Sequence, residues 1–295
     1  MPSLITQVRS KLFITSSRAS MHPLDGAYRS LLRGRSMDFE DLRPYEVGDQ
    51  VRDIDWRASA RLGEMLVKRT RATRLHTVMF VVDTGRTMAA LAEDEASKAQ
   101  TAIMAAGALG YLTVMHGDEV ALVYGDADGV RRTPGGRSEG ALEHQLRTIE
   151  KATASATAPG SIDALLAYVA RSVSRRVILV VIADEAPLTA ETERLVRRLR
   201  MQHDMVWLTV ADADPVLAQR GRAHRSDVVS GWEVPDFVHG DAAVREELAA
   251  ERARIADARD GLLDRWAISR ATLHDQDGAV SELLHMLDRR ARVGA

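Results

Sequence analysis

The chain has 295 residues, of which 45% are apolar, so a sizeable buried core is available and a disordered polypeptide is excluded. It contains no cysteine, which excludes disulfides, thiolate metal ligands and cysteine nucleophiles. The formal net charge is −2, but residues 1–75 carry 14 Lys and Arg against 9 Asp and Glu, whereas residues 76–295 carry 26 against 33. This asymmetry predicts either an acidic partner for the front of the chain or docking of the front on the back, and we favour docking.

The N-terminal residues contain no continuous apolar stretch, and the longest apolar run, 177–183, has the length of a strand. We therefore expect neither a signal peptide nor a membrane span, and a cytoplasmic location.

Residues 1–75 are predicted to form an N-terminal elaboration packed on the core. Leu4, Val8 and Leu12 recur at helical spacing behind Ser3, a plausible N-cap, which predicts a short amphipathic helix. Residues 33–70 are dense in charge, Gly and Pro, which is typical of an irregular, β-rich segment.

Residues 76–295 alternate strands with helices. Two runs, 77–82 and 177–183, are apolar apart from Thr77, as in adjacent central strands buried on both faces. An Ala-rich helix is predicted from the loop after the first run to about His116, and a long amphipathic helix at 241–267 is predicted to cover the sheet. Further strands are predicted at 119–124, 130–133, 205–211 and 268–273, and further helices at 138–150, 161–173, 189–202 and 277–291. The pattern predicts an α/β fold, a mostly parallel, Rossmann-like six-stranded sheet flanked by helices.

Polar side chains follow the two apolar strands. Asp83 and Asp184 come at their carboxyl ends, where ligands collect in such sheets. Thr87 and Ser161 could add hydroxyls from nearby loops, and these oxygens suit Mg²⁺, or else Mn²⁺ or Ca²⁺. The alternative, to which we give equal weight, is that the carboxylates only cap helices or accept hydrogen bonds from loop amides.

The run Asp83-Thr-Gly-Arg-Thr-Met88 resembles the first loop of the metal-ion-dependent adhesion site of von Willebrand factor A domains, which reads Asp-x-Ser-x-Ser. The resemblance implies that Asp83, Thr87, Ser161 and Asp184 are the metal ligands of a degenerate site. Gly85 stands where the first serine belongs, so one hydroxyl ligand is missing. We expect a serine at this position to strengthen metal binding.

Residues 33–69 resemble the signature of the domain-of-unknown-function 58 family, with its Leu-Arg-x-Tyr, Gly-Asp, Arg-x-Ile-Asp-Trp and Ser-Ala-Arg elements. One departure is Gln50, where a second acidic residue is expected. The resemblance implies a non-catalytic partner of a MoxR-type AAA+ ATPase, acting with it in chaperone-like assembly or activation of a client protein that the sequence does not identify. The signature residues are Arg43, Tyr45, Asp49, Arg52, Asp55, Trp56, Arg57, Ser59 and Arg61.

Two interpretations of the signature remain open. Residues 51–57 alternate with a period of two, which predicts a strand offering Ile54 and Trp56 to a core, with the aspartates paired to arginines. The signature is then a scaffold, and Arg57→Ala should destabilise the fold. If it is a recognition surface instead, Arg57→Ala should leave the fold stable and abolish association with the ATPase. We favour the scaffold, which requires a buried Trp56.

Two catalytic motifs are absent from the sequence. There is no Gly-x-x-x-x-Gly-Lys-Ser/Thr and no His-Glu-x-x-His. A metal-dependent hydrolase built on Asp83 and Asp184 is one rival function, but no general base is evident beside the metal. An arginine-rich nucleic-acid binder is the other, and it is disfavoured because nine acidic residues dilute the basic front.

Overall fold

The computed structural model describes residues 3–18, 26, 28, 30, 31, 41–46, 54, 56–69, 75–218 and 225–293. The strands are β1 (Asp41–Pro44), β2 (Leu66–Arg69), β3 (Thr77–Asp83), β4 (Glu119–Asp126), β5 (Gly129–Gly136), β6 (Ile178–Asp184), β7 (Asp204–Val210) and β8 (Ser269–Leu273). The helices are α1 (Leu4–Arg18), α3 (Trp56–Leu62), α4 (Lys98–Met115), α5 (Glu139–Ala154), α6 (Ile162–Ser172), α7 (Ala190–Gln202), α8 (Ala242–Arg265) and α9 (Ala279–Val293), with 3-10 turns η2 (Arg86–Ala89) and η3 (Asp236–Val238).

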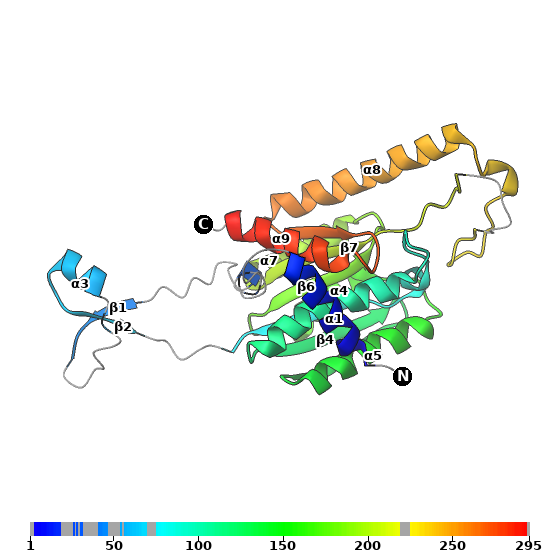
Figure 1. Cartoon of the computed structure of the whole chain (residues 1–295). Helices are drawn as coiled ribbons and strands as arrows, with labels where there is room; N and C mark the ends of the chain where they lie inside the picture. The colour runs from blue at the N-terminus through cyan, green and yellow to red at the C-terminus, as the bar shows by residue number, and fades with distance from the viewer. Residues whose placement is uncertain are drawn as a thin grey trace.

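Six strands form the main sheet in the order β5-β4-β3-β6-β7-β8 (Figure 1). All neighbours are parallel except the edge pair β4 and β5, which is antiparallel. β3 and β6 lie side by side, with Val82 opposite Ile182. The predicted six-stranded, mostly parallel sheet and the adjacency of its two most apolar strands are therefore confirmed.

Each face of the sheet buries its own apolar core, because successive strand residues point to opposite faces. Val78, Phe80 and Val82 pack with the helices α1, α4, α5 and α9. Met79 and Val81 pack on the other face with α6, α7 and the end of α8. Helices therefore cover both faces, as continuous apolar strands require.

Helix α4 begins later than predicted. After η2 the chain makes a turn, and Ser97 then caps α4, its Oγ accepting from the amide of Ala99 at 3.2 Å. The backbone amide of Lys98 donates to Ala90 O at 2.9 Å. Apolar and Ala-rich composition predicted the helix but not the cap that fixes its first residue. That residue is Lys98.

Helix α8 covers the sheet only with its last turns. Its buried residues are Arg259, Leu262 and Leu263, while its N-terminal part extends beyond the sheet (Figure 1). The prediction that this helix covers the sheet is therefore confirmed for its last turns and does not hold for its N-terminal part. Apolar residues spaced seven apart place one apolar side chain on the same helix face every two turns. An apolar stripe this sparse cannot bury one face of a 24-residue helix.

Helix α1 packs against α4 and α5, so this part of the basic front lies on the acidic remainder. Glu143 of α5 accepts from the amides of Leu4 at 3.1 Å and Ile5 at 3.0 Å. Ser3 occupies the predicted N-cap position, with its carbonyl accepting from the amide of Gln7 at 3.4 Å, but its hydroxyl donates to Glu143 at 2.9 Å instead of capping the helix. Lys11 pairs with Asp277 at 2.6 Å. A carboxylate from another helix thus satisfies the first amides of α1.

The signature segment forms a separate small unit of β1, α3 and β2. β1 and β2 are antiparallel, Ile54 bridges Val67, and Ile54, Leu66 and Val67 are buried. In Figure 1 this unit lies apart from the main sheet, so the structure does not show its predicted packing on the core. The boundary at residue 75 stays a prediction.

Trp56 corrects two predictions about the signature. It is the first residue of α3 rather than part of a strand, and it is 62% exposed rather than buried. The change of backbone conformation is the reason. Once a helix starts at Trp56, positions 54 and 56 no longer share a face, so Ile54 is buried and the indole is not.

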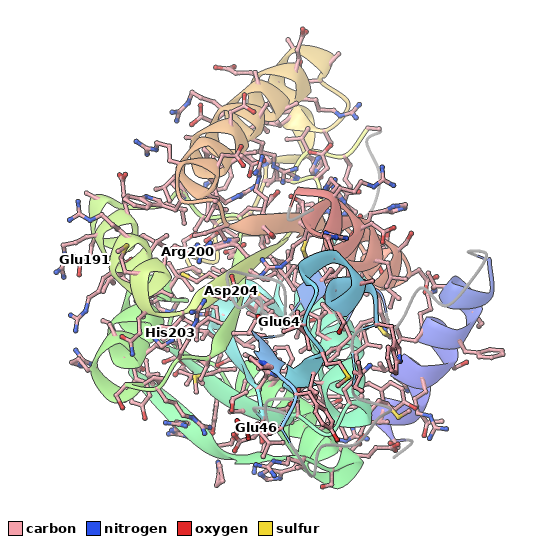
Figure 2. The ribbon with its side chains drawn as sticks, turned by 90° about the vertical axis from the view of Figure 1, so that its left-hand side faces the viewer. Glu46, Glu64, Glu191, Arg200, His203 and Asp204 are labelled. Carbon is pink, nitrogen blue, oxygen red and sulfur yellow. The ribbon has the colours of Figure 1, made fainter. Side chains whose placement is uncertain are left out.

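A buried polar cluster lies at the edge of the main sheet where the parallel strands begin. It is located where α7 ends and β7 begins. Figure 2 shows Arg200, His203 and Asp204 close together there. His203 is 1% exposed, and its Nδ1 accepts from the amide of Val177 at 3.4 Å. Burial, with Arg176 nearby, lowers the pKa of His203 to about 4.

We expect His203 to make stability fall as pH drops from about 6.5 to about 4. In that window the unfolded chain binds a proton at this position and the folded chain does not. The contribution is complete above the unfolded pKa. Chemical denaturation across this range should give a shallower pH dependence for His203→Gln than for the wild type. His144→Gln, on the exposed side of α5, is the control, and an equal flattening in it would contradict the assignment.

Candidate functional site

The first loop of the site begins at Asp83, which ends β3 and is 4% exposed. Its Oδ1 accepts from the amide of Gly85 at 2.8 Å. The next residue, Thr84, donates from its amide to Gly125 O at 2.9 Å, which ties the loop to β4. The aspartate therefore has one of the roles allowed by the sequence, that of an acceptor for a loop amide.

The first loop is pressed against the loop that precedes α6. The amide of Arg86 donates to Ala158 O at 2.9 Å. A Cβ on Gly85 would lie 2.3 Å from the backbone nitrogen of Gly160, and a Cβ on Gly160 would lie 2.1 Å from Asp83 Oδ2. Glycine is therefore required at both positions, because the two loops lie too close together to accommodate a Cβ. A serine at position 85, which the sequence predicts to add a metal ligand, would place its Cβ where the backbone of Gly160 already lies.

Lys98 supplies the cation of the site. Its side chain is 0% exposed, and its ammonium forms ion pairs with Asp184 at the end of β6 and with Asp212 just beyond β7, the latter at 2.7 Å. Asp184 also accepts from the amide of Glu185 at 2.7 Å. The ammonium thus joins α4 to the carboxyl ends of two neighbouring strands.

Burial and mutual charge set the protonation of these groups. Burial raises the pKa of Asp83 to about 6; the Gly85 amide and Lys98 oppose the rise, while Asp184 adds to it. Burial alone would lower the pKa of Lys98, but Asp184 and Asp212 outweigh it and raise that pKa. Lys98 is therefore held charged, while Asp83 is not stabilised as a carboxylate.

The two predicted hydroxyl ligands have different environments. Ser161 caps α6, its Oγ accepting from the amide of Ala164 at 3.3 Å. Thr87 Oγ1 is buried and has no hydrogen-bond partner among the described residues. Only Thr87 thus has a hydroxyl that is not already used within the fold.

The four predicted ligands lie around one edge of the sheet, but their arrangement does not fit a divalent metal. Asp184 is held by an ammonium, Asp83 is pressed against Gly160, and no hydroxyl can be introduced at Gly85. Within the described ranges no cluster of three or more His, Asp or Glu is arranged to hold a metal ion. Oxygen ligands around Mg²⁺ must be free to converge on it, and here they are engaged elsewhere.

Sequence reasoning missed Lys98 and Asp212. Asp212 follows β7 at the same edge as Asp83 and Asp184, and this position was a usable signal. Lys98 is one of only four lysines in a chain with 36 arginines. In so arginine-rich a chain the scarcity of lysine was a usable signal, because lysine supplies a compact ammonium that arginine cannot replace.

A cavity of about 500 Å³ opens beside this cluster. Asp184 and Asp212 line one side of it, and Trp232, which is 61% exposed, lines another. Arg225 at its rim pairs with Glu95 at 2.9 Å. The carboxyl edge of the sheet therefore presents a solvent-open acidic recess, lined by Asp184 and Asp212 and bordered by Trp232.

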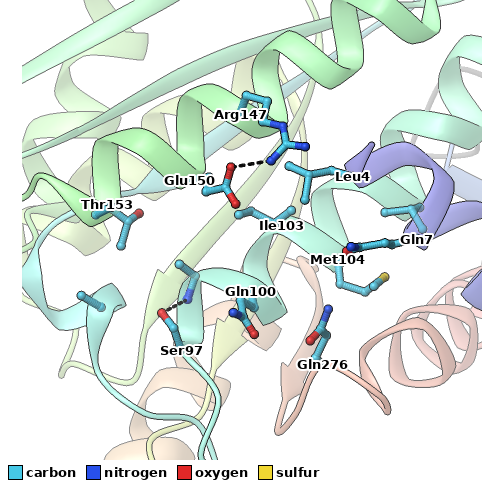
Figure 3. Close-up of a pocket in the computed structure, with 14 residues that line it drawn as sticks. Leu4, Gln7, Ser97, Gln100, Ile103, Met104, Arg147, Glu150, Thr153 and Gln276 are labelled. Atoms are coloured by element: carbon cyan, nitrogen blue, oxygen red, sulfur yellow. Dashed lines mark hydrogen bonds and ion pairs between the residues drawn. The ribbon is translucent and has the colours of Figure 1, made fainter. Parts of the chain in front are cut away.

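A second cavity, of about 650 Å³, lies between α1, α4 and α5 (Figure 3). Leu4 and Ile103 supply apolar walls, and Arg147 pairs with Glu150 at 2.8 Å beside them. The hydroxyl of Thr153, a residue only 3% exposed, has no partner in the described part of the chain. None of the predicted site residues lines this cavity.

The signature residues are only partly described. Tyr45 donates its amide to Met65 O at 2.8 Å, and Ser59 Oγ accepts from the amide of Leu66 at 2.8 Å, so both hold the small unit together. Trp56 and Arg61 are exposed on α3. Asp49, Arg52 and Asp55 lie outside the described residues, as do the side chains of Arg43 and Arg57. The predicted arginine–carboxylate lattice and the effect of Arg57→Ala therefore stay predictions.

A mostly parallel six-stranded sheet, with helices on both faces and an aspartate-led loop at its carboxyl edge, defines a von Willebrand factor A-like α/β protein. Residues 41–258 match the model of the family described as protein of unknown function DUF58. The match spans more than half of the chain, and the chain belongs to this family. A comparison with curated proteins finds no match.

The solved structures similar to this chain include the following two. An aerotolerance-related membrane protein from Bacteroides fragilis is 13% identical with a TM-score of 0.44, over 72% of this chain and 99% of that one. A von Willebrand factor type A protein from Catenulispora acidiphila is 12% identical with a TM-score of 0.42, over 74% of this chain and 43% of that one. In the described part of this chain, no helix combines the length and the apolar character needed to cross a membrane.

Proposed function

We propose that this protein is a non-catalytic interaction protein that binds a MoxR-type AAA+ ATPase and couples it, in the cytoplasm, to a client protein. The observation that carries the proposal is the exposure of Trp56 in the family signature. An indole that is 62% exposed at the start of α3 contributes nothing to a core and is available to a partner.

The small unit is suited to present such a contact. Ile54, Leu66 and Val67 are buried, and the hydrogen bonds of Tyr45 and Ser59 hold its strands and helix in place. Met65, on the same unit, is 53% exposed. Aromatic and methionine side chains on a rigid support are typical of the energetic centre of an interface.

The kind of partner is inferred from the family. The chain belongs to the DUF58 family. Its resemblance to proteins that are typically encoded beside MoxR-type ATPases implies a partner of that kind. The rival hydrolase has less support, because Lys98 engages the carboxylate of Asp184 that such an enzyme would need for its metal.

Replacing Trp56 with alanine is expected to weaken binding of the ATPase at least about tenfold while leaving the melting temperature nearly unchanged, since an exposed side chain stabilises the fold little. Binding can be measured by pull-down and titration with a MoxR-type ATPase from the same organism. The matched control is Trp232→Ala, which removes an equally exposed indole at the sheet edge.

The two substitutions distinguish the possible surfaces. Full binding by Trp56→Ala, with loss in Trp232→Ala, would move the interface to the acidic recess. A large fall in the melting temperature of Trp56→Ala would instead restore the scaffold interpretation.

A further inference from the structure

We infer that the ammonium of Lys98 is a resident cation that takes the place of a metal ion at the carboxyl edge of the sheet, so that the site is complete without a metal. Three described features support this: the position of the ammonium, its burial, and the crowding of the first two loops. The inference concerns the isolated protein and does not depend on the proposed partner.

The ammonium of Lys98 lies between two carboxylates. Lys98 bridges Asp184 and Asp212, which follow the adjacent strands β6 and β7. A divalent ion bound through Asp184 would have to displace the ammonium or lie beside it. Displacement would leave a buried lysine without its carboxylates, and coexistence would place like charges together at a buried site.

Burial of the Lys98 side chain keeps its ammonium beside the two carboxylates. The side chain of Lys98 is 0% exposed, and its residue opens α4 behind the Ser97 cap. Its backbone amide is also fixed, by Ala90 O at 2.9 Å. The lysine therefore cannot withdraw into solvent as a surface side chain would, and the cation is supplied by the fold itself.

The crowding of the loops removes the alternative of a metal bound through the first loop. Asp83 Oδ1 is occupied by the Gly85 amide, and Oδ2 lies against Gly160. Of the hydroxyls, Ser161 is used as a helix cap. Thr87 alone remains, and one hydroxyl beside one crowded carboxylate is too small a ligand set for Mg²⁺ or Mn²⁺.

The test compares the full chain with Lys98→Met, which keeps an apolar stem but removes the charge. Lys151→Met on α5 is the control for loss of a lysine. The melting temperature is measured in chelator and in millimolar Mg²⁺ or Mn²⁺, and Mn²⁺ binding is measured separately by electron paramagnetic resonance. We expect the wild type and Lys151→Met to bind no Mn²⁺ and to melt at the same temperature with and without metal.

In chelator, Lys98→Met is expected to melt about 10 °C lower, because two carboxylates lose their partner. Mn²⁺ should then bind to this variant and recover part of the loss by mass action. If Lys98→Met fails to fold, Lys98→Met/Asp184→Asn, which removes one unpaired charge, should fold and show no metal effect. Mn²⁺ binding by the wild type that Asp83→Ala abolishes would overturn the inference. So would a Lys98→Met protein that is as stable as the wild type in chelator, or one that is destabilised but gains nothing from Mn²⁺.

Discussion

Replacing Arg290 with alanine is expected to lower the free energy of unfolding by about 3–5 kcal/mol. Arg290 lies on α9 with a side chain 8% exposed, and it pairs with Asp204, whose side chain is 3% exposed. Its Nε donates to Ser30 O at 2.9 Å and its Nη1 to Ser269 Oγ at 3.0 Å. The guanidinium thus joins α9 to β7, to β8 and to Ser30. Its loss leaves the buried carboxylate of Asp204 with only the more distant guanidinium of Arg200, at 3.8 Å.

Urea denaturation of the variant and the wild type measures this effect, and Arg289→Ala is the control. Arg289 is the neighbouring residue, is exposed, and donates only to Arg270 O at 3.4 Å. Its loss should change stability by less than about 0.5 kcal/mol. Adding Asp204→Asn to Arg290→Ala should recover part of the loss, because the uncompensated charge is removed. A loss below about 1 kcal/mol in Arg290→Ala would mean that water reaches Asp204 in the folded state.

Replacing Gly85 with serine is expected to destabilise the protein by about 1–3 kcal/mol or more, because the new side chain would overlap backbone rather than a movable side chain. The Cβ would lie 2.3 Å from Gly160 N and 2.7 Å from the carbonyl carbon of Pro159. The loop before α6 would therefore have to move away from Asp83. A von Willebrand factor A-type metal loop would respond in the opposite way, because there a serine at this position is a ligand.

Thermal unfolding with and without Mn²⁺ measures both responses. The control is Gly261→Ser on α8, where an added Cβ meets nothing within 4 Å. A serine is a better helix former than glycine, so this variant should be as stable as the wild type or slightly more so. A Gly85→Ser protein with wild-type stability and metal-dependent melting would contradict both the crowding and the role of Lys98.

The sequence by itself determined the sheet and its two central strands. Residues 77–82 and 177–183 are apolar apart from Thr77, and short runs of this kind that are rich in β-branched residues are typical of strands buried on both faces. The two aspartates at their ends followed from the same pattern, because parallel strands end at one edge. The family signature was also recognisable from local spacing alone. These features depend on residues that are close together in the chain, and a local pattern is sufficient to define them.

The tertiary structure alone decided what surrounds those aspartates. Lys98 meets Asp184 and Asp212 across 86 and 114 residues, and no local pattern encodes such a contact. Gly85 looked like a lost hydroxyl in the sequence, but it is a requirement for close contact with Gly160, which lies on another loop. Trp56 looked like a core residue because alternation assumes a strand, and a helix beginning at that residue turns the indole outward. In each case the deciding quantity is the distance between segments remote in the chain or the conformation of the backbone, and both are set only when the whole chain packs.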